Sequence, residues 1–98
     1  MAMTPERRVK TQVRKVLDKL GAYYVMPVTG GYGNSGAPGF LVCVRGRFVG
    51  IECKAKGNTP TPLQEKNLRR IEECGGVSLV VNEDNVGVLE TELHRRVT

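Results

Sequence analysis

Two short apolar runs separated by a glycine-containing turn constrain the fold of this sequence most. The segment from Phe40 to Lys54 carries Arg45-Gly46-Arg47 between two runs rich in Val, Ile and Phe. A glycine between such runs is typical of a tight β-hairpin. The sequence therefore predicts two antiparallel strands, and we expect them to form the middle of a sheet.

The second of these strands ends in a charged pair. Because side chains alternate between the faces of a strand, Glu52 and Lys54 share one face while Cys53 points to the other. A charge in an otherwise apolar strand is costly to bury without a partner. We therefore expect this pair to face a partner, a metal ion or a substrate.

The rest of the chain is predicted to alternate helices and strands within one domain, residues 1–98. We expect a helix that begins after Thr4 and stops at Gly21, a strand over Tyr23–Val28, a helix that begins at Thr61 and ends at Gly75-Gly76, a strand over Val77–Val81, and a last helix over Val86–Val97 that Gly87 weakens. The continuous apolar run Val77–Val81 indicates a strand covered on both faces and paired in parallel through a helical crossover. The fold class is therefore mixed α/β, in the order α-β-β-β-α-β-α.

Two polar residues lie on the apolar stripes of the predicted helices, and each has two explanations. Glu6 either compensates the dipole of the first helix or points into a site. Gln64 either completes a capping box with Thr61 or points inward in the same way. The sequence leaves both alternatives open.

A glycine-rich stretch precedes the hairpin. Residues 29–36 contain four glycines and Tyr32, but no Gly-Lys-Ser/Thr follows them, and the next predicted element is a strand, which excludes a P-loop. The stretch is either a flexible loop or a loop that lets the backbone approach a phosphate, with Tyr32 available to stack or hydrogen-bond.

The charge of the chain favours a polyanionic partner. Fifteen Lys and Arg against ten Asp and Glu give a net charge of +5, and many of the basic residues lie on the first predicted helix. Most belong to solvated faces. Besides Tyr32, the candidate nucleic-acid contacts are Arg7, Arg8, Lys10, Arg14, Lys56 and Lys66.

Cysteine and histidine content argues against zinc. Cys43, Cys53 and Cys74 are odd in number and lie in apolar runs, so we expect reduced core residues of an intracellular protein. There is no CxxC pair, and His94 is the only histidine. No run approaches membrane-spanning length and no secretory signal is evident, so we expect no membrane contact and a cytoplasmic location in a bacterial or virus-infected cell.

The ordered motifs resemble a known family. Pro38, a hydrophobic strand and Glu52-Cys53-Lys54 are similar to the PD-(D/E)xK nucleases. More narrowly, nearly the whole chain resembles the virus-type replication-repair nuclease (VRR-NUC) domain, through Pro5-Glu6, Gly21-Ala22-Tyr23, Pro27-Val28, Gly36-Ala37-Pro38, Gly50-Ile51-Glu52-Cys53-Lys54-Ala55, Gln64-Glu65-Lys66-Asn67-Leu68 and Gly75-Gly76.

This resemblance implies a restriction-endonuclease-like core and a Mg²⁺- or Mn²⁺-dependent DNA endonuclease that needs no organic cofactor. It assigns metal ligands to Glu52 and the Cys53 carbonyl, water activation to Lys54, and supporting roles in the site to Glu6 and Gln64. It also implies double-stranded or branched DNA as substrate, a homodimer, and a role in viral DNA replication or repair.

The sequence departs from the family pattern at the residue after Pro38, which is Gly39 where an aspartate ligand is expected. Without that carboxylate, metal affinity falls, so we expect Glu6 and Glu52 to hold an ion only weakly and cleavage to be weak or absent. The competing hypothesis is a non-catalytic DNA-binding module that keeps the nuclease fold. A third is a structural domain in which the Glu52–Lys54 pair is neutralised internally.

Overall fold

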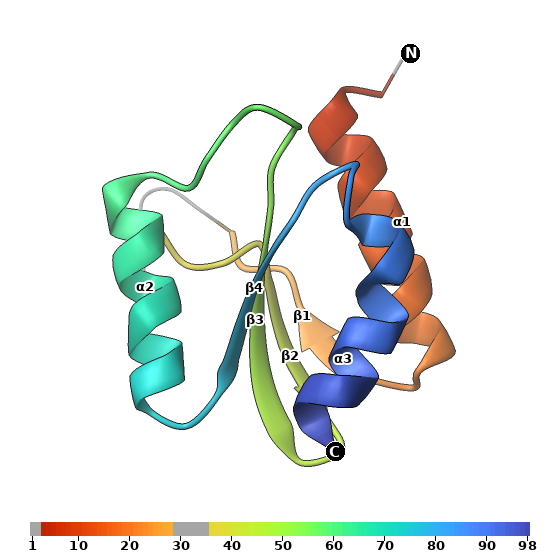
Figure 1. Cartoon of the computed structure of the whole chain (residues 1–98), viewed down its shortest axis with the longest axis vertical. Coiled ribbons are helices and arrows are strands. Elements are labelled where there is room, and N and C mark those ends of the chain that lie inside the picture. The colour runs from red at the N-terminus through yellow and green to blue at the C-terminus, as the bar shows by residue number, and fades with distance from the viewer. Residues whose placement is uncertain (1–2, 29–35) are drawn as a thin grey trace.

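Three helices and a four-stranded sheet make up the fold, which we describe from a computed structural model for residues 3–28 and 36–98 (Figure 1). The elements are α1 (Pro5–Lys19), β1 (Tyr23–Val25), β2 (Phe40–Val44), β3 (Arg47–Cys53), α2 (Pro62–Glu73), β4 (Val77–Val81), the 3₁₀ turn η1 (Val86–Val88) and α3 (Leu89–Val97). The predicted α/β class and the order α-β-β-β-α-β-α are confirmed. Tyr32 and most of the glycine-rich stretch lie outside the described residues.

The sheet has the strand order β1-β2-β3-β4, so the predicted hairpin forms its centre. β2 pairs antiparallel with both β1 and β3, whereas β3 pairs in parallel with β4 through the α2 crossover. The hairpin turns at Arg45 and Gly46, which both have positive φ, 52° and 77°. Two such residues in succession match the twist of the flanking strands, which explains the tight turn.

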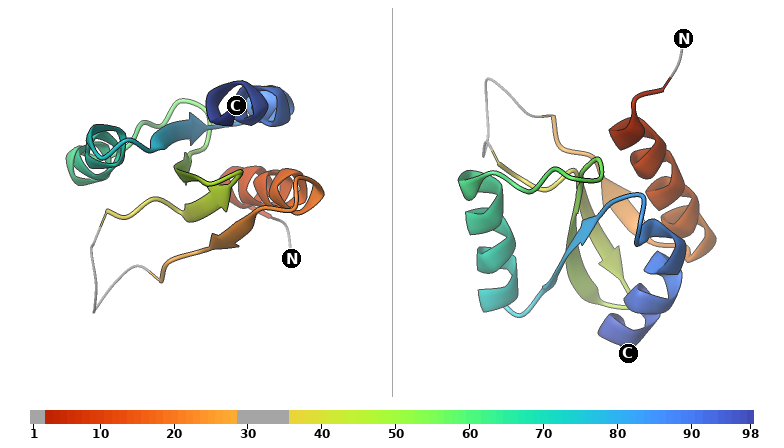
Figure 2. Two further views of the ribbon diagram at one scale, coloured as in Figure 1. Left: turned by 90° about the horizontal axis from the view of Figure 1, so that it is seen from below. Right: turned by 45° about the horizontal axis from the view of Figure 1, so that its top comes forward.

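The helices cover the two faces of the sheet unequally: α1 and α3 lie on one side and α2 on the other (Figures 1 and 2). The main core forms between the sheet and the α1–α3 side. It consists of Val9, Val13, Leu17, Phe40, Val42, Val44, Val49, Ile51, Cys53, Val77, Val81, Val86, Leu89, Leu93 and Val97. Because Val49, Ile51 and Cys53 face this core, the alternate positions of β3 must face α2.

Helix α2 lies close to the sheet because glycines stand beneath it. A Cβ atom on Gly50 would come within 2.5 Å of the Ile71 Cδ1 atom. One on Gly76 would come within 2.9 Å of both Ile71 Cγ2 and the Phe48 carbonyl oxygen. Gly75 and Gly76 also end α2 in a Schellman motif, with hydrogen bonds from their N–H groups to Glu72 and Ile71.

The α2 side of the sheet is less covered near β1. Tyr23, Cys43 and Phe48 are register partners across β1, β2 and β3, and all three are exposed. Cys74, at the C-cap of α2, is exposed as well. The prediction of three core cysteines is therefore wrong for Cys43 and Cys74, since one faces the uncovered part of the sheet and the other follows a helix end.

Two element boundaries and the environment of one strand also differ from the predictions. The first strand ends at Val25 instead of Val28 because the chain leaves the sheet before Pro27. The last helical segment divides into η1 and α3 around Gly87, a weak helix former. β4 is an edge strand whose Val80 is 37% exposed, so the prediction that it is covered on both faces is only partly correct.

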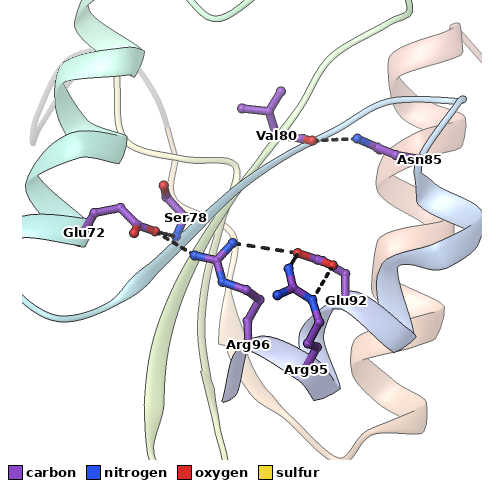
Figure 3. A network of polar contacts seen from close by, with 7 residues as sticks. All are labelled: Glu72, Ser78, Val80, Asn85, Glu92, Arg95 and Arg96. Carbon is purple, nitrogen blue, oxygen red and sulfur yellow. Dashed lines mark hydrogen bonds and ion pairs between the residues drawn. The ribbon is translucent and has the colours of Figure 1, made fainter. Parts of the chain in front are cut away.

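A polar network joins α2, β4 and α3 away from the central hairpin (Figure 3). Arg96 contacts Glu72 at 3.4 Å and Glu92 at 3.8 Å, and Glu72 accepts a hydrogen bond from the Ser78 N–H. Asn85 donates to the Val80 carbonyl at 3.0 Å. These contacts hold α3 to the sheet and occupy polar groups at the β4 edge, so we interpret the network as structural.

Candidate functional site

A cavity of about 200 Å³ brings together residues from five segments. It lies where the first two turns of α1, the residues after β1, the residues before β2, the end of β3 and the start of α2 meet. Its lining residues are Glu6, Lys10, Met26, Pro27, Ala37, Gly39, Glu52, Lys54 and Gln64. Glu6, Glu52, Lys54 and Gln64, the four side chains that the resemblance assigns to a site, therefore lie around one cavity together with Gly39.

Glu52 is the buried acid of this cavity, with an exposed fraction of 7%. Its Oε1 accepts a hydrogen bond from the Gly39 N–H at 3.0 Å, and its Oε2 lies 3.7 Å from the Lys54 Nζ. Burial raises the pKa of the Glu52 carboxyl above its usual value, although the Gly39 N–H and the Lys54 charge both oppose that rise. Glu52 is therefore held in place by its neighbours but pays a desolvation cost for its charge.

Lys54 is placed by the same strand. Its side chain is 15% exposed and faces Glu52, as the period of two predicted. Its backbone N–H donates to the Val81 carbonyl at 2.9 Å, which continues the pairing toward β4 just beyond the end of β3. The ammonium group is thus positioned by the sheet backbone on one side and by a carboxylate on the other.

Glu6 enters the cavity from the first turn of α1. Thr4 caps this helix by accepting a hydrogen bond from the Arg7 N–H at 3.3 Å, and Pro5 occupies the first helical position. The Glu6 carboxylate lies 3.5 Å from the Lys10 Nζ, one turn later. Glu6 therefore lies both at the positive end of the helix dipole and in the cavity wall, so the two predicted explanations are compatible.

Gln64 likewise combines its two predicted placements. Its Oε1 accepts from the Thr61 N–H at 2.9 Å while its own N–H donates to the Thr61 Oγ1 at 3.2 Å, which confirms the capping box. Gln64 also lines the cavity. Because its amide oxygen is already bonded to the helix cap, it is a poor candidate for a metal ligand.

Gly39 leaves space where the family pattern has a carboxylate. A Cβ atom built on Gly39 would lie 3.8 Å from the Ile51 carbonyl oxygen and 4.0 Å from the Lys10 Cε, both ordinary contact distances. No positive φ restricts the position to glycine. The backbone can therefore accept an aspartate here, whereas Gly50 and Gly76 have no such space.

The donor groups present do not fit a tightly held divalent ion. Mg²⁺ and Mn²⁺ prefer several oxygen ligands, with carboxylates supplying the negative charge. Glu6 and Glu52 each lie beside a lysine, and the Cys53 side chain is buried in the core, so Cys53 has only a backbone oxygen to offer. Within residues 3–28 and 36–98, no three His, Cys, Asp or Glu side chains gather as a metal-binding group.

A basic groove adjoins the cavity along α1. Its volume is about 300 Å³, and it is lined by Met3, Arg7, Lys10, Thr11, Arg14 and Met26. Lys10 and Met26 line both the groove and the cavity. Arg7, Lys10 and Arg14 lie three and four residues apart, which places them on one face of the helix.

The other predicted nucleic-acid contacts lie elsewhere. Arg8 is exposed and lines neither the cavity nor the groove. The Lys56 Nζ lies 3.5 Å from Asp84, and Lys66 lines a separate hollow on α2. Tyr32 is outside the described part of the chain. Among the described members of this set, Arg7, Lys10 and Arg14 are the ones that lie in the cavity or in the groove beside it.

Lys10 lies in the cavity, although the sequence predicts for it only a contact with DNA. It is not predicted to be a neighbour of the acidic residues. The signal was present, because Lys10 follows Glu6 by four residues and such pairs meet on a helix. The missing information was that the α1 face carrying Glu6 lies beside Gly39.

The comparisons agree with this architecture. No family model and no curated protein matches the sequence. A solved structure described as a "VRR_NUC domain" superposes with a TM-score of 0.70 and 26% identity, covering 90% of this chain and 97% of that one. No helix among the described residues is long and apolar enough to cross a membrane. The resemblance predicted from the sequence motifs is therefore confirmed in three dimensions: this chain has the fold of the VRR-NUC nuclease family.

Proposed function

We propose that this chain is a DNA-binding domain of the nuclease family whose phosphodiester-cleaving site is incomplete at Gly39. In functional terms it is a Mg²⁺- or Mn²⁺-dependent DNA endonuclease in a weakened or inactive form. One observation carries the proposal: Glu6, Glu52, Lys54 and Gln64 come from three different elements and line one cavity around Gly39. Such a convergence of charged groups at a partly buried position is typical of functional sites.

The roles follow from position and charge. The Arg7–Lys10–Arg14 groove supplies positive charge beside the cavity, and contacts of this kind hold the DNA backbone without reading its sequence. A phosphate that follows the groove reaches Lys54, whose ammonium group stabilises negative charge on phosphate oxygens. Glu52 holds Lys54 in position, and Glu6 holds Lys10. An aspartate at position 39 would add the carboxylate that the family uses.

The decisive experiment compares the natural chain with Gly39→Asp on supercoiled plasmid and on a four-way junction, each with Mg²⁺ and with Mn²⁺. We expect little or no nicking by the natural chain and nicking measurably above that background by Gly39→Asp. Gly39→Ala is the matched control, since it also adds a Cβ atom at this position but no carboxylate. Gly39→Asp combined with Glu52→Gln should again be inactive.

Two results would contradict the nuclease proposal. One is absence of cutting by Gly39→Asp on both substrates with both ions. The other is cutting that persists at the same rate after Glu52→Gln. The comparison of plasmid with junction also tests the preference for branched DNA, and the molar mass in solution tests the proposed homodimer.

A non-catalytic DNA-binding module is the second candidate, and the pairing of both acids with lysines favours it. This candidate predicts DNA binding by the natural chain that weakens steeply between two salt concentrations. Arg7→Gln and Arg14→Gln should each weaken binding, whereas Arg8→Gln, which changes the same charge outside the groove, should have less effect. If all three variants bind equally, the groove is not the DNA contact.

A further inference from the structure

Lys10 occupies an unusual place among the basic residues of α1, because it lines the acidic cavity as well as the basic groove. Its Nζ lies 3.5 Å from the Glu6 carboxylate. Its charge also acts on Glu52, where it favours the ionised carboxylate and so opposes the effect of burial on the pKa. Lys10 therefore interacts with both acids of the cavity.

The charges that line the cavity cancel without any ion. Two carboxylates, Glu6 and Glu52, face two ammonium groups, Lys10 and Lys54. Lys54 is mostly buried against Glu52, whereas the Lys10 side chain is 35% exposed and comes from a different element. Removing the charge of Lys54 would leave the buried Glu52 carboxylate without its ion-pair partner. Removing the charge of Lys10 would not.

The same lysine stands next to the position that lacks a carboxylate. A Cβ atom on Gly39 would lie 4.0 Å from the Lys10 Cε. The oxygens of an aspartate lie two bonds beyond its Cβ, so a rotamer that points toward Lys10 can bring them within ion-pair distance of the ammonium group. Restoring the acid at position 39 therefore gives Lys10 a second partner, and a metal ion must compete with Lys10 for the new carboxylate.

We propose that the Lys10 ammonium group takes the place of a divalent cation in this cavity, so that Lys10 and Gly39 together determine that the cavity does not bind Mg²⁺ or Mn²⁺. A positive charge beside the two carboxylates repels a divalent ion that binds to them, and this repulsion is stronger in a partly desolvated site than in water. The inference concerns the site of the proposed function, but it requires only metal binding and no cleavage.

The test measures Mn²⁺ binding by electron paramagnetic resonance and by calorimetry, without DNA. We compare the natural chain with Gly39→Asp, Lys10→Gln and the double variant Gly39→Asp/Lys10→Gln. We expect negligible binding at millimolar Mn²⁺ by the natural chain and weak binding by Gly39→Asp. The double variant should bind Mn²⁺ at least tenfold more tightly than Gly39→Asp alone.

Two controls isolate the position of the charge. Lys15→Gln, added to Gly39→Asp, removes the same charge from an exposed residue of the same helix that does not line the cavity. It should leave the affinity of Gly39→Asp unchanged. Lys10→Arg, added to Gly39→Asp, keeps the charge and should keep binding weak.

The proposal is overturned if Gly39→Asp and the double variant bind Mn²⁺ equally, or if Lys15→Gln increases affinity as much as Lys10→Gln. Circular dichroism establishes that each variant is folded, and if Lys10→Gln unfolds the chain, Lys10→Met is used instead, because it keeps an unbranched apolar stem without the charge. Tight Mn²⁺ binding without DNA cleavage by the double variant would count against the proposed nuclease function while supporting the role of Lys10.

Discussion

Replacement of Gly76 by alanine should destabilise the fold strongly, because the new methyl group has no space. Its Cβ atom would lie 2.9 Å from the Phe48 carbonyl oxygen, 3.2 Å from the Ile71 carbonyl oxygen and 2.9 Å from Ile71 Cγ2. Two of these atoms belong to backbone fixed by β3 and by the end of α2. The strain must therefore move a secondary-structure element and cannot be relieved by rotating one side chain.

The cost can be estimated from similar overpacked sites. Forcing an extra methyl group into a packed position costs about 1–3 kcal/mol, and contact with two backbone atoms suggests roughly 2 kcal/mol here. For a domain of this size, 1 kcal/mol changes Tm by about 4–8 °C, so the expected decrease is about 8–16 °C. Thermal melting followed by circular dichroism, with urea unfolding as a second measurement, gives both quantities.

Gly87→Ala is the matched control, because a Cβ atom there meets nothing within 4 Å and the φ angle is not positive. We expect its stability to be unchanged or to increase by a few tenths of a kcal/mol, since alanine favours helical backbone over glycine. If Gly76→Ala melts within 2 °C of the natural chain, the close packing of α2 on the sheet is not the reason for glycine at this position.

Three further predictions concern the cavity, the thiols and a helix cap. Because burial raises the pKa of Glu52, its ionised carboxylate opposes folding at pH 7, so Glu52→Gln should have a higher free energy of unfolding than the natural chain at that pH. Urea titrations should show this difference disappear below about pH 4, where the glutamate is protonated in both the folded and the unfolded state. Burial raises the pKa of the Cys53 thiol to about 12. A thiol reagent at pH 8 should therefore modify the exposed Cys43 and Cys74 quickly and Cys53 only after unfolding. Equal modification rates for all three thiols would contradict the burial of Cys53. Thr61→Ala removes the hydroxyl that caps α2 and should lower the free energy of unfolding by about 1 kcal/mol, whereas an unchanged urea midpoint would show that the cap contributes little.

Much of the fold could be predicted because local signals agreed with one another. The turn at Gly46, the capping box at Thr61 and the stop at Gly75-Gly76 each have a short-range physical cause, and the structure shows all three. The alternation along β3 also predicted which side chains share a face. Since these signals depend only on neighbouring residues, one sequence was enough to read them.

The predictions that failed depend on how distant elements pack. Cys43 and Cys74 lie in or beside apolar segments, but their exposure depends on where α2 ends and how far it covers the sheet. The position of Lys10 in the cavity depends on the distance between α1 and Gly39, which no local pattern encodes. The roles of Glu6, Glu52, Lys54 and Gln64 stay predictions, because the structure gives their location and not their activity.

β3 pairs with a neighbouring strand along each of its two edges. Glu52 lies on a strand bonded to β2 and β4, so its backbone is fixed by the sheet whatever chemistry the cavity performs. Position 39 and Lys10 lie outside any strand, with room around the former and partial exposure of the latter. Substitutions at these two positions can therefore remove or restore a set of ligands while the architecture that supports them persists.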